Sequence, residues 1–264
     1  MSEERQTEPP GPPGRARLRL TWLGQAGFAI AAADGFSCLV DPYLSDWCAR
    51  HSNNPRVPPI ALDPSTVRPT LVVTSHWHDD HLDPEAIPVI ARCSPRTVFA
   101  GPPSCGVRYR WWGVSEERIV VLRQGESATV GPARVTAGFA RHEVPGMLTE
   151  DAISIILEID GRRIFHSGDT EYDTRILAVR SRGPIDVGLF VINGGGGNMN
   201  LREAAFLAAE LEAGLAIPMH YGMWRKEKYG PGATLDPEEF VRRFRALSRG
   251  RAMALKHAEP IEIA

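Results

Sequence analysis

The chain has 264 residues, of which 43% are hydrophobic and 23% are charged, as is typical of a single large globular domain. Thirty Lys and Arg against 32 Asp and Glu leave a formal net charge of −2, so no global field would draw the protein to nucleic acid or to anionic lipid. No apolar run approaches the roughly 18 to 20 residues of a membrane-spanning helix, and the N-terminus does not look like a secretory signal, so we expect a cytoplasmic protein that binds no membrane.

The first part of the chain predicts a tail followed by strands. Residues 1–17 are rich in Pro, Gly and charge and predict a disordered tail, so one folded domain is expected over residues 18–264. Alternating and β-branched residues over 18–41 predict a hairpin or meander. Residues 47–69 hold five prolines and predict a long surface loop.

The middle of the chain predicts further strands and one helix. A β-branched strand ending near Ser75 precedes a helix over 85–92, and another strand is predicted over 97–102. Three consecutive antiparallel strands are then expected, over residues 118–122, 126–130 and 133–143. Residues 152–170 predict a hairpin that turns at Asp160-Gly161.

The last third of the chain alternates strands with helices. A buried strand, an amphipathic helix, another strand and a final helix are predicted over residues 187–193, 201–213, 215–220 and 237–249. Together with the strand-rich first part, this pattern indicates an α/β protein.

The densest chemical signal is the run His76-Trp77-His78-Asp79-Asp80-His81, which follows an apolar strand. Imidazole and carboxylate groups are common ligands of transition metals. In a tight turn His76 and His78 would point to one side and Asp80 and His81 to the other, which predicts two neighbouring metal sites. A polar loop that caps the following helix is disfavoured, because a solvated loop has no reason to concentrate histidines there.

These residues resemble a known signature. The run from His76 to His81 is similar to the H-x-H-x-D-H motif of the metallo-β-lactamase superfamily, whose fold is a four-layered αβ/βα sandwich of two mixed β-sheets flanked by helices. Residues 18–240 also resemble the L-ascorbate-6-phosphate lactonase-like branch, through TWLGQAGFAI, DPYLSD, SGDTEYD, NMN and IPMHYGMW.

The resemblance implies a ligand set for two divalent metal ions. One ion would be bound by His76, His78 and His142, the other by Asp80, His81 and His220, with Asp169 bridging both. Five imidazoles and two carboxylates suit zinc, manganese or iron, and the donor set does not choose among them. The lactonase-like branch implies manganese.

Four other residues are candidates for supporting roles. Asp41 and His166 would hydrogen-bond the metal ligands, although a turn residue and a core histidine are the alternatives. Asn198 and Asn200 follow the Gly194–Gly197 run, whose amides could cradle a phosphate or an oxyanion of the substrate. The alternative is a flexible connection with Asn200 as a helix N-cap.

The predicted chemistry is hydrolysis. Two ions sharing a carboxylate can generate a bridging hydroxide, which Asp80 can orient as the catalytic residue. The leading hypothesis is a hydrolase that opens a lactone or ester of a small polar metabolite, with or without a phosphate. A phosphodiesterase with the same site and a non-catalytic metal-binding protein are the alternatives. The aromatic residues around Trp111 are compatible with a homo-oligomer.

Overall fold

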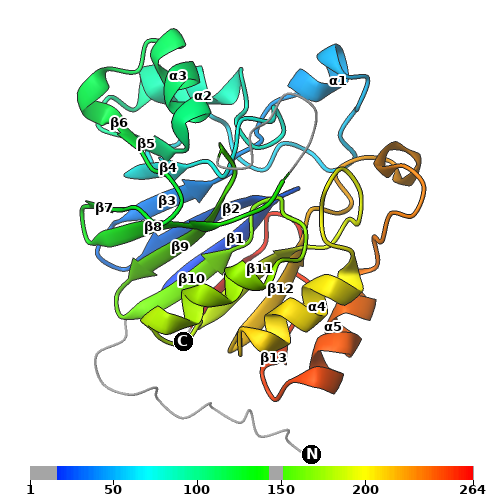
Figure 1. The fold of residues 1–264 in the computed structure, drawn as a ribbon. Helices are drawn as coiled ribbons and strands as arrows, with labels where there is room; N and C mark the ends of the chain where they lie inside the picture. The colour runs from blue at the N-terminus through cyan, green and yellow to red at the C-terminus, as the bar shows by residue number, and fades with distance from the viewer. Residues whose placement is uncertain (1–16, 143–150, 264) are drawn as a thin grey trace, which may run out of the picture.

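The computed structural model describes residues 17–142 and 151–263. Apart from Arg17, the tail predicted over residues 1–17 lies outside this range, as does the last residue of the strand predicted over 133–143. The described residues form two seven-stranded sheets that pack face to face, with helices on the outer faces (Figure 1). This is the four-layered αβ/βα arrangement predicted from the sequence.

The first sheet combines an antiparallel part with a parallel part. Strands β14, β1, β2 and β3 pair antiparallel, and β3, β4, β5 and β6 pair parallel. Its strands, in sheet order, are β14 (Pro260–Ile263), β1 (Leu18–Gly24), β2 (Gly27–Ala32), β3 (Ser37–Val40), β4 (Leu71–Val73), β5 (Val98–Gly101) and β6 (Ile119–Val121). The predicted meander over residues 18–41 is therefore confirmed.

The second sheet has the same mixed construction. Its strands, in sheet order, are β13 (Arg251–Ala252), β12 (Leu215–Met219), β11 (Val187–Val191), β10 (Arg162–His166), β9 (Ile153–Ile159), β8 (Ala133–Phe139) and β7 (Ser127–Val130). Strands β7 to β10 pair antiparallel and β10 to β13 pair parallel. Asp160 and Gly161 turn the β9–β10 hairpin with φ of 50° and 70°, as a type I′ turn requires.

Helices cover the outer faces of both sheets. Helices α2 and α3 lie on the first sheet, and α4 and α5 on the second (Figure 1). The helices are α1 (Trp47–His51), α2 (Ala86–Cys93), α3 (Pro103–Trp111), α4 (Leu201–Glu210) and α5 (Pro237–Leu247), with 3-10 turns at Glu116–Arg118, Thr174–Arg182 and Lys226–Tyr229. Among the described helices, none is long and apolar enough to cross a membrane.

The main core lies between the two sheets, and a smaller core lies under α2 and α3. Strand β4 contributes to both, because Leu71 and Val73 face the core between the sheets while Val72 faces the helices. A strand buried on both faces reads as a continuous apolar run. This explains why β4 shows no alternation of apolar and polar residues, and why polar residues begin where the strand ends.

Three local predictions differ from the structure. Strand β6, expected to pair antiparallel with the strand after it, instead pairs parallel with β5 in the other sheet, because alternation identifies a strand but not its partner. The segment predicted as loop from residue 47 begins with helix α1, which precedes all five prolines. Helix α3 was not predicted, because only Cys105, Gly106 and Tyr109 are buried and they form no apolar stripe.

Candidate metal centre

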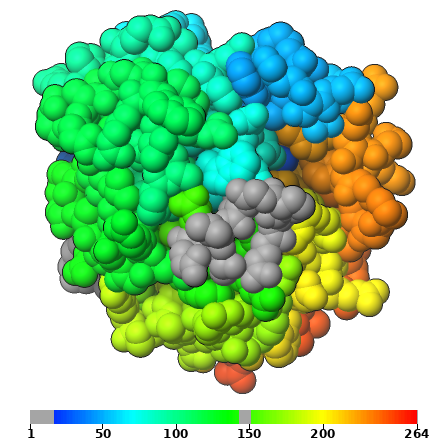
Figure 2. All heavy atoms as spheres, turned by 45° about the horizontal axis from the view of Figure 1, so that its top comes forward, coloured from blue at the N-terminus to red at the C-terminus, as the bar shows by residue number. Residues whose placement is uncertain are grey.

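The candidate metal ligands come together at one edge of the sandwich. His76 follows β4, Asp169 follows β10 and His220 follows β12, so each lies just beyond the carboxyl end of a strand. His142 follows β8, which runs in the same direction as β10 because each pairs antiparallel with β9. Figure 2 looks onto this face, where the blue segment of α1 and the orange segment after β12 lie on one side of the cyan segment after β4.

Histidine side chains from the two sheets make the first group of donor atoms. His76 Nε2 lies 2.9 Å from His78 Nδ1, and His142 Nε2 lies 3.3 Å from the same atom. His142 Nε2 is also 3.9 Å from Asp169 Oδ2. His76 and His142 are buried, and His78 is partly exposed.

The second group adjoins the first at Asp169. His220 Nε2 is 3.2 Å from Asp169 Oδ2, and His81 Nε2 is 3.5 Å from Asp169 Oδ1. His81 Nε2 and His220 Nε2 are 3.4 Å apart, and Asp80 carboxylate oxygens lie 4.0 Å from His81 and 3.8 Å from His220. The candidate ligands form three overlapping sets of three residues, and in each set the ligand atoms of the three residues lie within 4.8 Å of one another. One set is His76, His78 and His142, another is His76, His81 and Asp169, and the last is Asp80, His81 and His220.

The atoms that face the centre of the cluster are hydrogen-bond acceptors, so they are better suited to binding a cation than to bonding with one another. The outer nitrogens of His76, His81 and His142 contact Ser75 Oγ, Asp41 Oδ2 and the Gly197 carbonyl oxygen. In neutral imidazoles those contacts leave lone pairs on the nitrogens that face the centre. Asp169 Oδ1 is buried without a hydrogen-bond partner among the described residues. A cation would satisfy these converging acceptors.

Charges in the centre favour an added positive charge. Burial alone would raise the pKa of Asp169, but the imidazoles of His220 and His81 hold that pKa well below its usual value. Burial alone would lower the pKa of His81, but the carboxylates of Asp169, Asp41 and Asp80 raise that pKa well above its usual value. The buried carboxylates therefore stabilise positive charge at His81, whether it comes from a proton or from a metal ion.

Asp41 and His166 lie next to the ligand cluster and support it differently. The fully buried Asp41 carboxylate accepts hydrogen bonds from Ser75 N–H and Ser75 Oγ–H, at 2.7 and 2.6 Å, and contacts His81 Nδ1 at 2.8 Å. His166 Nδ1 accepts from Gly168 N–H at 3.0 Å, which leaves Nε2 as the donor to the Ala26 carbonyl oxygen at 2.8 Å. Asp41 thus contacts a candidate ligand directly, whereas His166 holds the turn that precedes Asp169.

The two asparagines predicted to contact substrate have different surroundings. Asn198 Nδ2 donates to Asp169 Oδ2 at 2.8 Å, and its side chain lines the cavity beside the centre. Asn200 accepts from the backbone N–H groups of Arg202 and Glu203 and forms a capping box with Glu203 at the start of α4. The N-cap alternative therefore accounts for Asn200, while Gly195 and Gly196 line the cavity.

The cavity beside the candidate ligands has a volume of about 350 Å³, within the usual range for small-molecule sites. An adjoining cavity of about 240 Å³ shares Asn54, His78, Asp80 and Trp224 with it. The sequence prediction missed several of the residues that line the 350 Å³ cavity, namely Gln25, Asn54, Asn193, Trp224, Lys228 and Tyr229. For Gln25 a signal was available, because the Gly residues on either side of Gln25-Ala26 indicate a tight turn. No pattern in the sequence indicates that Lys228 or Asn54 lines the cavity.

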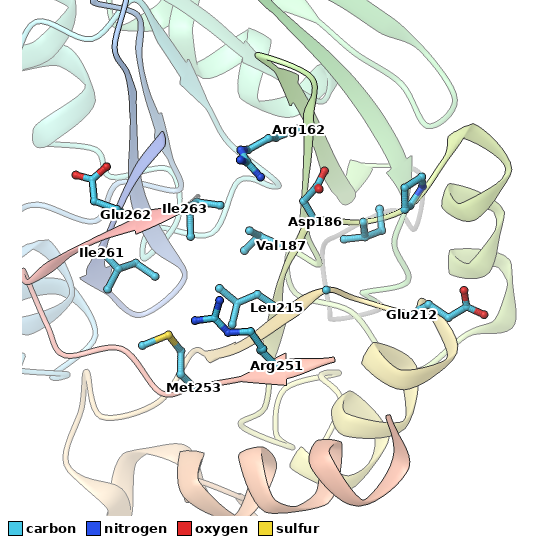
Figure 3. Close-up of a pocket in the computed structure, with 13 residues that line it drawn as sticks. Arg162, Asp186, Val187, Glu212, Leu215, Arg251, Met253, Ile261, Glu262 and Ile263 are labelled. Atoms are coloured by element: carbon cyan, nitrogen blue, oxygen red, sulfur yellow. The ribbon is translucent and has the colours of Figure 1, made fainter. Parts of the chain in front are cut away.

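A larger cavity, of about 560 Å³, lies at the opposite end of the strands. Arg162, Val187 and Leu215 begin strands β10, β11 and β12 there, and Figure 3 shows them with Arg251 and Met253 around the opening. Charged residues of both signs and aliphatic residues line it, and no histidine or cysteine is among the described lining residues. Size alone would select this cavity, but the converging donor groups lie at the other edge.

The fold and the histidine and aspartate cluster define a metal-dependent hydrolase of the metallo-β-lactamase type. A family model described as the beta-lactamase superfamily domain matches residues 37–221, well over half of the chain. The chain therefore belongs to the beta-lactamase superfamily.

Individual relatives agree with this assignment. The chain is 25% identical to the "Probable L-ascorbate-6-phosphate lactonase UlaG" of Shigella boydii, over 88% of this chain and 76% of the relative. It is 28% identical to a UPF0173 metal-dependent hydrolase of Methanopyrus kandleri, over 85% of this chain and 90% of the relative. Among solved structures, Igni18, a metallo hydrolase of Ignicoccus hospitalis, matches 94% of this chain and 99% of its own at a TM-score of 0.74 and 20% identity. The predicted superfamily and lactonase-like branch are confirmed.

Proposed function

We propose that this protein hydrolyses a lactone or ester of a small polar metabolite, with two divalent metal ions bound at the candidate metal centre. The observation that carries the proposal is the pair of donor groups that meet at Asp169 beside the 350 Å³ cavity. His76, His78 and His142 would hold one ion, and Asp80, His81 and His220 the other, with Asp169 shared. When bound, such ions supply Lewis acidity that polarises a carbonyl oxygen and lowers the pKa of a water molecule.

The side chains around the cavity have separate tasks in this proposal. The Asp80 carboxylate lies at the cavity wall, where it can orient a water and accept its proton. Asn198 also lines the cavity, where its Nδ2 holds the shared Asp169 carboxylate through a hydrogen bond to Oδ2 of 2.8 Å. Lys228 provides a positive charge for an anionic group such as a carboxylate or phosphate. These groups favour a small, polar substrate.

The test is a hydrolysis panel with protein that has been loaded with zinc or manganese and checked by elemental analysis. Sugar lactones, simple esters and bis(p-nitrophenyl) phosphate would be compared at equal concentration. We expect turnover of at least one lactone or ester and its loss on chelation. Turnover confined to the phosphodiester would establish the alternative activity, and a fully loaded protein that hydrolyses none of them would favour a non-catalytic metal-binding role.

A further inference from the structure

Gln25 lies in the tight turn between β1 and β2, and its side chain is fully buried against the candidate metal centre. Its amide Nε2 donates to Asp80 Oδ2 at 2.7 Å and lies 3.2 Å from His220 Nε2. Its backbone carbonyl accepts hydrogen bonds from His220 N–H and from Trp22 Nε1–H, both at 2.9 Å. One residue outside the ligand set thus contacts two of the three members of the second group.

The backbone of Gln25 is in the left-handed region, with φ of 49°. Asp41, which borders the centre, and His220, which is one of its candidate ligands, share this conformation with φ of 43° and 65°. Such conformations cost energy in residues other than glycine, and they persist where the surroundings over-determine them, often at functional sites. A turn needed only to connect β1 and β2 would be better served by Gly or Asn at position 25, so the side chain itself is the reason for a glutamine.

The Tyr229 hydroxyl group fixes the orientation of the Gln25 amide. It accepts hydrogen bonds from the backbone N–H groups of Met223 and Trp224, at 3.0 and 3.4 Å, and donates to Gln25 Oε1 at 3.5 Å. Because the hydroxyl proton goes to Oε1, the amide nitrogen is turned toward Asp80. The same hydroxyl holds the segment 221–229, from which Trp224 and Lys228 line the cavity.

We propose that Gln25 and Tyr229 are positioning residues for the second metal position. The Gln25 amide engages Asp80 Oδ2 and thereby holds the Asp80 carboxylate beside the other two candidate ligands, with Oδ1 4.0 Å from His81 Nε2 and Oδ2 3.8 Å from His220 Nε2. A ligating carboxylate is commonly held by such a hydrogen bond on its other oxygen. Tyr229 joins this arrangement to the cavity wall. The inference rests on the proposed function and deepens it, since it names the residues that tie one metal position to the surface that meets substrate.

Two substitutions test the inference, with a third as control. Gln25→Asn retains an amide and tolerates the left-handed backbone, but it is one methylene too short to reach Asp80. Tyr229→Phe removes only the hydroxyl group, and it carries the test if the first variant fails to fold. Tyr172→Phe is the control, because its hydroxyl bonds to Glu210 Oε2 at 2.6 Å, away from Asp80.

The measurement is a calorimetric titration of metal-free protein with Co²⁺, followed in parallel by the visible spectrum of the bound ion. The step that fills the second metal position is called the second step here, whichever ion binds first. In Gln25→Asn we expect this step to weaken about 10- to 100-fold, the usual effect of losing a hydrogen bond to a ligand, while the other step changes by less than about twofold. Tyr229→Phe should weaken the second step about 2- to 10-fold, the equivalent of one hydrogen bond. Only the spectrum of the second ion should change, and the control should match the wild type.

Equal losses at both steps, unchanged binding in both variants, or tighter second-step binding in Gln25→Asn would each overturn the inference. The last result would mean that the amide competes with the ion. Wild-type protein that binds only one ion would overturn both this inference and the two-ion centre of the proposed function. Two ions in the wild type without a selective effect of the variants would overturn this inference alone.

Discussion

Replacing Asp41 with Asn exchanges one oxygen of a fully buried carboxylate for an NH₂ group. Oδ1 of Asp41 accepts one hydrogen bond from Ser75, and Oδ2 contacts a second Ser75 donor and His81 Nδ1. Whichever way the amide is turned, at least one buried donor faces the NH₂ group. An unpaired buried donor costs about 1–3 kcal/mol, and losing the negative charge weakens the remaining bonds. We expect the free energy of unfolding to fall by about 2–4 kcal/mol.

The same substitution should weaken metal binding. Asp41 selects the His81 tautomer whose Nε2 lone pair faces Asp169 and His220, so its replacement should lower metal affinity about 10- to 100-fold. Stability is measured by urea unfolding of metal-free protein, because a bound ion would add its own stabilisation. With a slope of about 3 kcal/mol per M, the midpoint should fall by roughly 1 M.

Asp83→Asn is the matched control for Asp41→Asn. The Asp83 carboxylate is also buried and accepts hydrogen bonds from Leu44, Ser45, Glu85 and Ala86, but no hydrogen bond joins it to a candidate ligand. The Asp83→Asn variant should have a lower free energy of unfolding than the wild type but the same metal affinity. An Asp41→Asn variant that unfolds at the wild-type midpoint and binds metal as tightly as the wild type would refute the reasoning.

Three further substitutions distinguish residues that bind metal from residues that hold the surrounding structure in place. Asp169→Asn should lose bound metal by elemental analysis and lose hydrolysis, because the shared carboxylate is gone; wild-type metal content would remove Asp169 from the ligand set. His166→Ala should retain both ions and lose rate about 10- to 100-fold, and an unchanged rate would leave His166 a packing residue. Asn200→Ala should cost about 1 kcal/mol of unfolding free energy through the lost cap, with metal affinity and KM unchanged, whereas a raised KM would indicate substrate contact.

The convergence of the candidate ligands could be predicted from the sequence where they lie close together in the chain or directly after strands. His76, His78, Asp80 and His81 are nearly contiguous, and any turn that holds them brings several donors together. His142, Asp169 and His220 were located by resemblance, and the parallel course of β8, β10 and β12 explains why residues so far apart in the sequence meet.

What could not be predicted depends on contacts between distant segments. The pairing of Gln25 with Asp80 joins turns of two different strands, and the contribution of Lys228 and Tyr229 depends on how the segment after β12 folds back. Strand β6 was placed in the wrong sheet for a related reason, since its neighbour is chosen by tertiary packing and not by its own alternation. Local patterns identify elements and dense clusters, but they do not identify the walls of a cavity.

The candidate ligands are divided between the two sheets: those after β4 belong to one, and those after β8, β10 and β12 to the other. An ion bound by residues of both sheets would link the two sheets at this edge of the sandwich. A chain whose two sheets have not docked offers the candidate ligands of only one sheet at a time, so full affinity arises only once the sheets have docked. Metal uptake would then serve as a read-out of correct assembly.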